Sequence, residues 1–471
     1  MKKFFYLSLA FGLCFLWSGG IFLTVFFRLY EHYDEIQVTY ITDVLYYIMQ
    51  AAGLFTFTLY ARNRLFDLRK HIVVNITLGA ITLLFGIIAI NSTNPTRILV
   101  SGALMNISIG CLMCSFLIRI SKYLSANTRG KSFALAYTTG SIGTYLISIP
   151  SGGNALNKDY IIWIYIALAV IALFLVTLFD IECSMPAEAS DLSGNKKIAP
   201  EGEKKNNTIL LMVLIPFFFM VINNMGYHFE QAIADDINIV FTRAFYSIGL
   251  LTAGFIVDKK KQLGALLAFL SLSFPLICLS FKGNTNYLFT SSVLNYVFLG
   301  FITVYQVVLF IDIGDRYPDK SHMSVFGYGI ARIGTAVGTT AGILLEKNQL
   351  LLICATLVLY VIFGLIFFTY QCINHTSPET IVTETTAERK DRIFREYSSR
   401  YGFNGKQTEV LRLLLDGYPN GEIAEKLYLA ESTVKYHVKN ILKITGFKNR
   451  NELISDYAAL ESEDDSRHRS L

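Results

Sequence analysis

Twelve long apolar stretches dominate this sequence and leave few folds open to it. A helix needs about 20 apolar residues to cross the hydrocarbon core of a bilayer. Hydrophobic residues make up 53% of the 471 residues and charged residues only 16%, which argues against a water-soluble protein of this size. Because backbone groups in lipid must bond within their own segment, the stretches predict an all-α membrane bundle. The expected spans are 5–27, 40–61, 72–91, 98–118, 132–150, 159–180, 208–226, 237–257, 263–281, 287–311, 323–344 and 350–371.

Lysine and arginine are distributed unevenly between the connections that join these stretches. Alternate connections carry 19 of them, and the intervening ones carry five, which are Arg28, Arg97, Lys158, Lys282 and Lys347. Positively charged connections face the cytoplasm, so we expect both chain termini on that side of the membrane. The first stretch continues to about residue 27 without a clear cleavage site, so we expect a span and not a signal peptide.

Short matches at one spacing relate the two halves of the membrane part. Tyr137 and Tyr328 are 191 residues apart, as are the Ile-Gly-Thr triplets that begin at Ile142 and Ile333. The same shift places Asp67-x-Arg69-Lys70 on Asp258-x-Lys260-Lys261. Repeated matches at one offset predict a duplicated six-helix unit.

This arrangement of six plus six spans around a long polar connection resembles the major facilitator superfamily. The loop motif of that family, Gly-x-x-x-Asp-Arg/Lys-x-x-Arg/Lys, is matched in the second half by Gly254, Asp258, Lys259 and Lys261. The first half has Asn63 at the glycine position and retains only Asp67, Arg69 and Lys70. The resemblance implies that these charges hold neighbouring helix ends together in one conformational state.

Polar side chains at membrane depth are costly and are candidate ligand contacts. An arginine that faces a central cavity suits an anionic ligand such as a carboxylate, which it can bind with two hydrogen bonds. Alternatively, the arginines pair with structural carboxylates or helix-end carbonyls, and the amides join helices to one another. The candidate ligand-binding residues are Gln50, Asn106, Asn223, Arg243, Gln306 and Arg332. The only CxxC, Cys111 and Cys114, has no second pair, so neither a metal nor a cofactor is expected.

A different pattern begins near residue 404. Val410, Leu411 and Leu414 lie on one face of a predicted helix, and Gly417 suits its C-terminal cap. A second short helix follows, then a break at residues 428–430 and a third helix from about 431 to 444. Lysines at positions 435, 439 and 443 form a basic ridge on the third helix. A short helix, a turn and a longer helix with a positive outer face indicate a helix-turn-helix, whose second helix fits the DNA major groove.

Residue by residue, this region resembles the LuxR-type helix-turn-helix of bacterial transcription factors. The matching residues are Glu409-Val410-Leu411, Gly417, Asn420, Glu422-Ile423-Ala424, Leu427, Thr433-Val434-Lys435, His437-Val438, Ile441-Leu442, Gly446 and Asn449-Arg450. One departure is Ala430, which stands where the family has a serine or threonine cap. Its loss should weaken the start of the third helix by about 1 kcal/mol.

The resemblance implies a role for each residue on the DNA-facing side. Lys435, Tyr436 and Lys439 would face base edges and nearby phosphates, and Thr433 and Lys443 would hold the DNA backbone. In the family a fourth helix supplies the dimer contact, so we expect a homodimer on double-stranded DNA. The corresponding residues are Leu453, Ile454 and Tyr457.

The sequence therefore predicts an all-α chain in six parts. They are a first six-span half (1–180), a cytoplasmic central loop (181–207), a second six-span half (208–371), a linker with an amphipathic helix (372–402), a four-helix DNA-binding domain (403–460) and a polar tail (461–471). In the linker, Ile393, Phe394 and Tyr397 share one side of a helix that we expect to pack against the DNA-binding domain.

These features favour a membrane-embedded one-component transcription regulator. Its transporter-like bundle would sense a small molecule and control DNA binding by the cytosolic domain. The alternative is a working secondary transporter with an attached regulatory domain. We do not expect an enzyme, because the sequence has no nucleophile–base pairing, metal-ligand spacing or phosphate-binding glycine loop.

Overall fold

A computed structural model describes residues 2–62, 68–151, 160–184, 203–231, 241, 244–280, 285–376, 386–403 and 405–469. These residues form helices joined by short turns, with no strand among them, which confirms the expected all-α fold. The chain divides into two compact units, Met1–Cys372 and Ile373–Leu471.

The first unit is a bundle of long helices. Its first half contains α1 (Lys2–Tyr30), α2 (Glu35–Thr39), the π-helix η1 (Tyr40–Tyr46), α3 (Tyr47–Arg62), α4 (Leu68–Asn91), α5 (Pro95–Tyr123), α6 (Arg129–Ser148), η2 (Ile149–Ser151) and α7 (Tyr160–Ser184). Its second half contains α8 (Glu203–Gln231), α10 (Tyr246–Lys259), α11 (Lys261–Ser271), α12 (Ser273–Ser280), α13 (Thr285–Ile311), α14 (Ile313–Arg316), η5 (Pro318–Val325), α15 (Phe326–Leu345) and α16 (Gln349–Thr376).

Eight helical stretches of the described residues are long and apolar enough to cross a membrane. They are Lys3–Tyr30, Glu35–Ala61, Ile72–Asn91, Pro95–Tyr123, Tyr160–Ile181, Asn207–Met225, Thr290–Asp315 and Gln349–Ile373. The other four expected spans overlap α6, α10, α11 with α12, and α15, and residues 237–240, 242 and 243 of the span 237–257 lie outside the described residues. Glycine, serine and threonine make α6 and α15 less apolar, which suits helices in the middle of a bundle.

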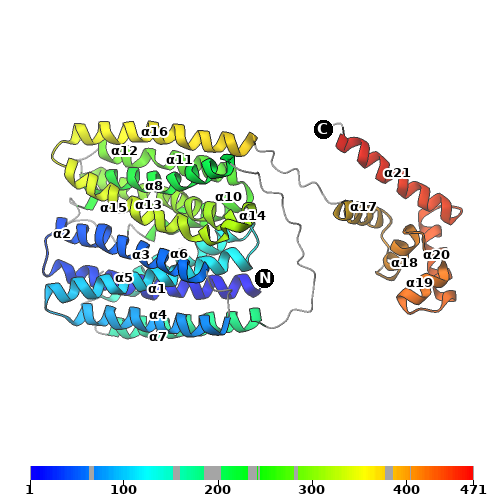
Figure 1. The fold of residues 1–471 in the computed structure, drawn as a ribbon, viewed down its shortest axis with the longest axis horizontal. Coiled ribbons are helices and arrows are strands. Elements are labelled where there is room, and N and C mark those ends of the chain that lie inside the picture. Colours follow the sequence, from blue (N-terminus) through cyan, green and yellow to red (C-terminus); the bar gives the residue numbers. More distant parts are fainter. Residues whose placement is uncertain are drawn as a thin grey trace. The chain divides into compact units, whose positions relative to one another are not determined.

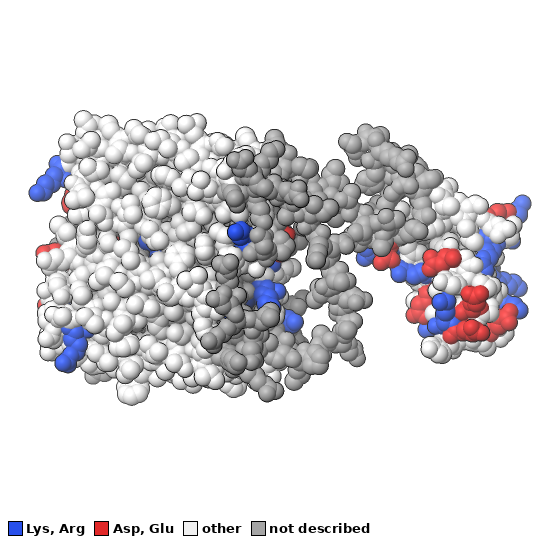
Figure 2. Space-filling view, viewed as in Figure 1, with Lys and Arg blue, Asp and Glu red and all other residues white. Residues whose placement is uncertain are grey.

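The outside of the first unit carries large apolar side chains. Trp163, Leu344 and Leu350 are each at least 70% exposed. Figure 2 shows this surface as mostly uncharged, with few Lys, Arg, Asp or Glu side chains over the middle of the helices. Such a continuous apolar surface is stable in lipid and not in water. The first unit is therefore a membrane domain.

The bundle consists of two groups of helices, the first running from α1 to α7 and the second from α8 to α16 (Figure 1). Within the first group α1 packs on α6 and α7, and α5 packs on α3 and α4. Within the second group α8 packs on α15, and α10 packs on α13. The groups meet where α6 packs on α10 and where α3 packs on α15. These two contacts are equivalent when the halves are exchanged, as a duplicated unit requires.

Close glycine contacts hold α10 against α13. A Cβ atom on Gly249 would lie 1.7 Å from the backbone oxygen of Val297, and one on Gly300 would lie 2.4 Å from the carbonyl carbon of Gly249. Only glycine permits such an approach of two backbones, and small residues commonly mark helix crossings in membranes.

The first half has the same crossing between α3 and α5. A Cβ atom on Gly53 would lie 2.0 Å from the backbone oxygen of Ile107, and one on Gly110 would lie 2.0 Å from that of Gln50. Ile107 and Gly110 precede Val297 and Gly300 by 190 residues, close to the spacing of the sequence matches. The packing therefore supports the predicted duplication.

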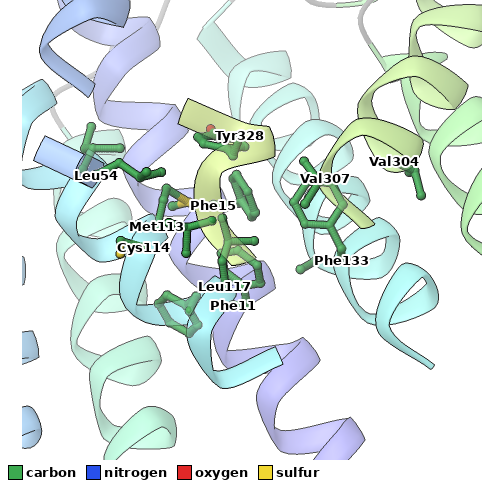
Figure 3. Packing of buried hydrophobic residues seen from close by; sticks show 14 of the residues in the cluster. Phe11, Phe15, Leu54, Met113, Cys114, Leu117, Phe133, Val304, Val307 and Tyr328 are labelled. Carbon is green, nitrogen blue, oxygen red and sulfur yellow. The ribbon is translucent and has the colours of Figure 1, made fainter. Parts of the chain in front are cut away.

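Aromatic side chains fill the middle of the bundle (Figure 3). The rings of Phe11 and Phe116 stack with centroids 4.6 Å apart, and Phe15 lies edge to face with Phe133 at 6.2 Å. Tyr328 from the second half lies beside this first-half cluster in Figure 3. The core of the bundle is thus shared between the two halves.

One buried ion pair changes the count of lysines and arginines in the connections between the spans. Arg119, which follows the expected span 98–118 and is one of the 19 cations counted in the alternate connections, lies inside α5 and is 1% exposed. Its guanidinium donates to both carboxylate oxygens of Asp180 in α7, at 2.9 and 2.6 Å. Because the two charges are buried together, Arg119 belongs to the packing of the first half and carries no information about orientation.

The described residues of the second unit form five helices around a separate core. They are α17 (Thr386–Tyr401), α18 (Gly405–Leu415), α19 (Asn420–Leu427), α20 (Glu431–Thr445) and α21 (Arg450–Arg469). Helix α21 continues past residue 461, where we expected a polar tail to begin. The buried residues of this core are Phe394, Tyr397, Val410, Leu411, Leu414, Ile423, Ala424, Val434, Ile441 and Leu453.

The α10–α13 crossing yields a test of the bundle packing. Replacement Gly249→Val should lower the stability of the membrane unit by about 1–3 kcal/mol or more, because the added atoms collide with backbone. Thermal unfolding of the purified full-length protein measures this loss. Gly19→Ala is the control, since the nearest neighbouring atom would be 4.0 Å from its new Cβ. Equal melting temperatures for the two variants would contradict the described crossing.

Candidate DNA-binding surface and central cavity

Helix α20 is fixed in the second unit by its apolar side. Val434 and Ile441 are fully buried in the core, and Val438 and Leu442 pack partly buried beside them. The helix ends at Gly446, whose φ of 79° is the left-handed conformation that favours glycine. At its start, no side chain hydrogen bond caps the helix at Ala430, as predicted from the missing hydroxyl.

The opposite side of α20 is free of the domain core. Lys435, Tyr436, Lys439 and Lys443 are exposed, Tyr436 by 62%, and Thr433 is partly exposed. All five predicted DNA-facing residues therefore reach the surface of one helix. Three of them are lysines spaced one turn apart, which concentrates positive charge along the helix.

An acidic neighbour modifies this basic surface. Lys435 Nζ lies 3.0 Å from Glu431 Oε1, and both side chains are more than half exposed. The pair spans one helical turn, so the spacing of Glu431 and Lys435 in the sequence already indicates it. Lys435 must therefore exchange a carboxylate for a phosphate or base if it contacts DNA.

A tight joint connects α19 to α20. Tyr428 ends α19 with φ 54°, and its side chain is 96% exposed. The N–H of Leu429 donates to the carbonyl of Ala424 at 2.9 Å, which closes the turn. A non-glycine residue in the left-handed region costs about 1–2 kcal/mol. The packing of α19 and α20 on the core must offset this cost to hold Tyr428 in that conformation.

The predicted dimer contact in α21 needs correction. Leu453 is fully buried in the core of its own unit and is not available to a second copy. Ile454 and Tyr457 are partly buried against the same core. The ring of Tyr457 lies edge to face with that of Tyr397 in α17, with centroids 5.2 Å apart.

Helix α17 packs on α21 as expected. The hydroxyl of Tyr397 donates to Asp456 Oδ2 at 2.9 Å. Burial, and then the neighbouring Asp456 carboxylate, raise the pKa of Tyr397 above its ordinary value, so the phenol remains a donor. Phe394 is buried beside it and lies under the guanidinium of Arg412 at 4.5 Å. Helix α17 is therefore part of the folded domain and not a free tether.

The membrane unit contains a cavity between its halves. First-half residues form most of its wall, and Tyr328 and Arg332 of α15 close it from the second half. The full lining is Phe15, Ser18, Gly19, Phe22, Leu23, Tyr47, Gln50, Ile109, Met113, Tyr137, Gly140, Ser141, Thr144, Tyr328 and Arg332.

The candidate ligand residues are only partly brought together. Gln50 and Arg332 line the cavity. Asn106 lies behind Gln50 and accepts a hydrogen bond from its Nε2 at 2.7 Å. Asn223 and Gln306 are buried in the second half and do not line this cavity. Arg243 lies outside the described residues.

Charged residues join the halves at the end of the bundle where α1 begins. Asp258, at the end of α10, accepts hydrogen bonds from the N–H groups of Gly130 and Lys131, at 2.7 and 2.9 Å. Its carboxylate thereby caps the N-terminus of α6. Gly254 permits the contact, because a Cβ there would lie 2.7 Å from the Cβ of Ala134.

Arginine and aspartate extend this contact. Arg129 at the start of α6 lies 2.8 Å from Asp312 and also pairs with Asp315. Lys261 pairs with the same Asp312. We call Arg129, Asp258, Lys261, Asp312 and Asp315 the charge clasp. The loop motif in the sequence contains Asp258 and Lys261 but not Arg129, Asp312 or Asp315, although two aspartates directly after an apolar span are a usable signal.

The matching charges of the first half cannot be compared with the clasp. Asp67 lies outside the described residues, and the side chains of Arg69 and Lys70 do too. Among the described residues, every ion pair between the halves belongs to the clasp or lies beside it at Lys131.

The second unit matches a known family of regulators. Residues 404–456 match the family described as bacterial regulatory proteins, luxR family. A segment of 77 residues is 36% identical to the transcriptional regulatory protein DegU of Brevibacillus brevis and covers 16% of this chain. The chain spans about a third of the length of DegU, 33%. A segment of 60 residues is 30% identical to the spore germination protein GerE of Bacillus subtilis, covering 13% of this chain and 81% of GerE.

The first unit is similar in fold to a major facilitator superfamily transporter. The solved structure of FucP in the outward conformation aligns with a TM-score of 0.53 and 16% sequence identity. The alignment covers 79% of this chain and 98% of FucP. At this identity the likeness shows the fold alone, and it agrees with the two six-helix halves expected from the sequence.

The uncapped start of α20 yields a prediction about stability. Ala430→Ser should stabilise the second unit by about 1 kcal/mol, because a serine hydroxyl can accept from a free N–H of the first turn. Urea unfolding of residues 373–471, which contain the complete second core, measures the gain. Ala458→Ser, at an exposed position within α21, is the control and should give no gain. A destabilised Ala430→Ser protein would show that the turn cannot hold a capped geometry.

Proposed function

We propose that this chain, which belongs to the luxR family of bacterial regulatory proteins, is a one-component transcription regulator embedded in the bacterial inner membrane. In this proposal the transporter-like bundle senses a small molecule and thereby controls sequence-specific DNA binding by the second unit. The observation that carries it is the presence, in one chain, of a helix with an exposed lysine ridge and of a major-facilitator-like membrane unit.

The proposed topology places both termini in the cytoplasm. Without the buried Arg119 and Arg129, 17 lysines and arginines remain in one set of connections against five in the other, so the bias persists. The last residue of α16 is Thr376 and the first of α17 is Thr386, so the DNA-binding unit follows directly after the membrane unit in the chain. This order supports a regulator that reads the genome from the membrane surface.

The chemistry of α20 supports groove recognition. Lysines release counterions from phosphates, which supplies affinity for any duplex. Lys435, Tyr436 and Lys439 would reach base edges and nearby phosphates, while Thr433 and Lys443 would hold the backbone. One such module offers a small interface, so we expect two copies on a pair of half-sites. The exposed surface of α21 is the candidate for the pairing contact, through Ile454 and Tyr457 rather than Leu453.

Sensing requires a ligand that prefers one arrangement of the halves. A tenfold preference corresponds to about 1.4 kcal/mol of shift in the equilibrium. The cavity and the charge clasp both lie between the halves. A ligand in the cavity can therefore favour an arrangement of the halves in which the ion pairs of the clasp are broken. Movement of the halves would then alter the position or pairing of the DNA-binding units.

A second candidate function is secondary transport coupled to regulation. The clasp favours it, because charges that lock one end of a two-half bundle are what an alternating-access cycle needs. Uptake of candidate compounds into sealed vesicles, driven by an ion gradient, separates the two functions. Sustained accumulation above the bound amount indicates a transporter, and saturable binding without accumulation indicates a sensor.

Replacement of Lys439 tests the proposed DNA contact. Lys439→Ala should weaken binding to DNA fragments selected by the wild type by about 1–3 kcal/mol, and should reduce the slope of log K against log salt by about 1. Gel-shift titration of the full-length protein in lipid nanodiscs measures both.

Lys406→Ala is the matched control for that experiment. Lys406 lies on α18, away from the lysine ridge, and pairs with Glu409 at 2.8 Å. Its replacement should leave both the affinity and the salt slope unchanged. Wild-type affinity in Lys439→Ala, or an equal loss in both variants, would contradict the assignment of the surface.

A further inference from the structure

Arg332 is a cation of the membrane unit that no carboxylate of the described residues balances. It lies in α15, one turn after Tyr328, and lines the cavity. Among the described residues it forms no ion pair. Its Nε is buried and has no hydrogen-bond partner. Arg119, which is buried in the first half, is in contrast paired with Asp180.

Two tyrosine rings hold the guanidinium in place. Its carbon lies 4.2 Å from the ring centroid of Tyr47 and 4.6 Å from that of Tyr328. Arg332 also donates to the hydroxyl of Tyr328. Cation–π contacts of this kind offset part of the cost of burial but supply no counter-charge. The guanidinium is thus oriented beside the cavity, and its Nε retains a donor without a partner.

The other residues of the cavity wall indicate what kind of group a ligand of Arg332 carries besides its charge. Phe15, Phe22, Ile109 and Met113 give the wall an apolar part, and Ser18, Ser141 and Thr144 line it beside them. One further polar atom is unpaired: Gln50 Oε1 is buried without a partner, while its Nε2 is held by Asn106. A ligand that fits has an anionic group for Arg332 and an apolar body for the rings.

We propose that the cavity is a binding site for a small organic carboxylate, held by Arg332 through its carboxylate group. A carboxylate accepts two parallel hydrogen bonds from a guanidinium, which neutralises the buried cation. This deepens the proposed function by naming the class of molecule that the bundle senses, and it rests on that function for its biological meaning. The binding itself does not depend on DNA.

The site also joins the two halves. Arg332 and Tyr328 come from α15 in the second half, and the apolar wall comes from α1 and α5 in the first. A carboxylate whose body lies on the first-half wall and whose charge lies on Arg332 holds these halves together. The bound molecule therefore favours one arrangement of the bundle, which is the property that a sensing ligand needs.

The test uses the full-length protein in detergent micelles, with benzoate and hexanoate as probes and the corresponding amides as uncharged controls. Both carboxylates should raise the melting temperature by several degrees at millimolar concentration, and benzamide and hexanamide should not. Equal shifts from an acid and its amide, or no shift from either carboxylate, would overturn the proposal.

Substitutions then show whether the carboxylates bind at Arg332. Arg332→Gln should weaken benzoate binding by about tenfold or more, because the charge and the paired donors are lost. Arg97→Gln, an exposed arginine at the start of α5, is the matched control and should bind as the wild type does. Wild-type affinity in Arg332→Gln would place the carboxylate elsewhere and would refute the site.

Two measurements keep the result clear if Arg332→Gln does not fold. Arg332→Lys retains the charge but not the planar pair of donors, so its affinity for benzoate should fall while its melting temperature without ligand stays close to that of the wild type. Radiolabelled benzoate on the wild type should be displaced by hexanoate and not by hexanamide. Benzoate binding without any DNA binding would refute the proposed function alone, and DNA binding without carboxylate binding would refute only the ligand site.

Discussion

The hydrogen-bonding requirement of the peptide backbone within lipid determines the architecture of the first unit. No water is present at membrane depth to satisfy an exposed N–H or C=O group, and the described residues of the expected spans are helical accordingly. Polar side chains follow the same rule: the hydroxyls of Ser18, Thr24 and Thr58 donate to carbonyls one turn earlier. Glycines permit the helices to approach until their backbones touch. Under these conditions an unbalanced charge inside the bundle stands out, and Arg332 is such a charge.

The interface between the halves contains both features that a switch needs. The cavity lies between α15 and the helices of the first half, and the charge clasp lies between α6, α10 and the end of α13. Since these sites share one interface, any relative movement of the halves changes both. The clasp depends on opposite charges at helix ends and is open to disruption by salt or substitution. The cavity depends on shape and on a single cation, which makes it selective for the kind of molecule that can enter.

Much of this structure could be predicted from the sequence, because much of it depends on local patterns. Apolar length located the spans, and residue spacing located the helix-turn-helix and its lysine ridge. The remainder depends on contacts between distant residues. Arg119 and Asp180 are 61 positions apart, and only the packing of α5 on α7 reveals that they pair. Likewise the sequence placed Gln50, Asn223 and Gln306 at membrane depth but could not give the helix rotations that turn only Gln50 towards the cavity. Leu453 was misassigned because α21 uses that side for its own core.

The position of α17 has a practical consequence for work on the isolated regulator. A soluble fragment that begins at residue 404, where the family match starts, would lack Phe394 and Tyr397 and would uncover the side of α21 on which they pack. Such a fragment would expose apolar surface that is covered in the intact chain, and its self-association or poor yield would reflect the truncation. Fragments that include α17 retain the complete core and are the appropriate starting point for crystallisation or solution NMR.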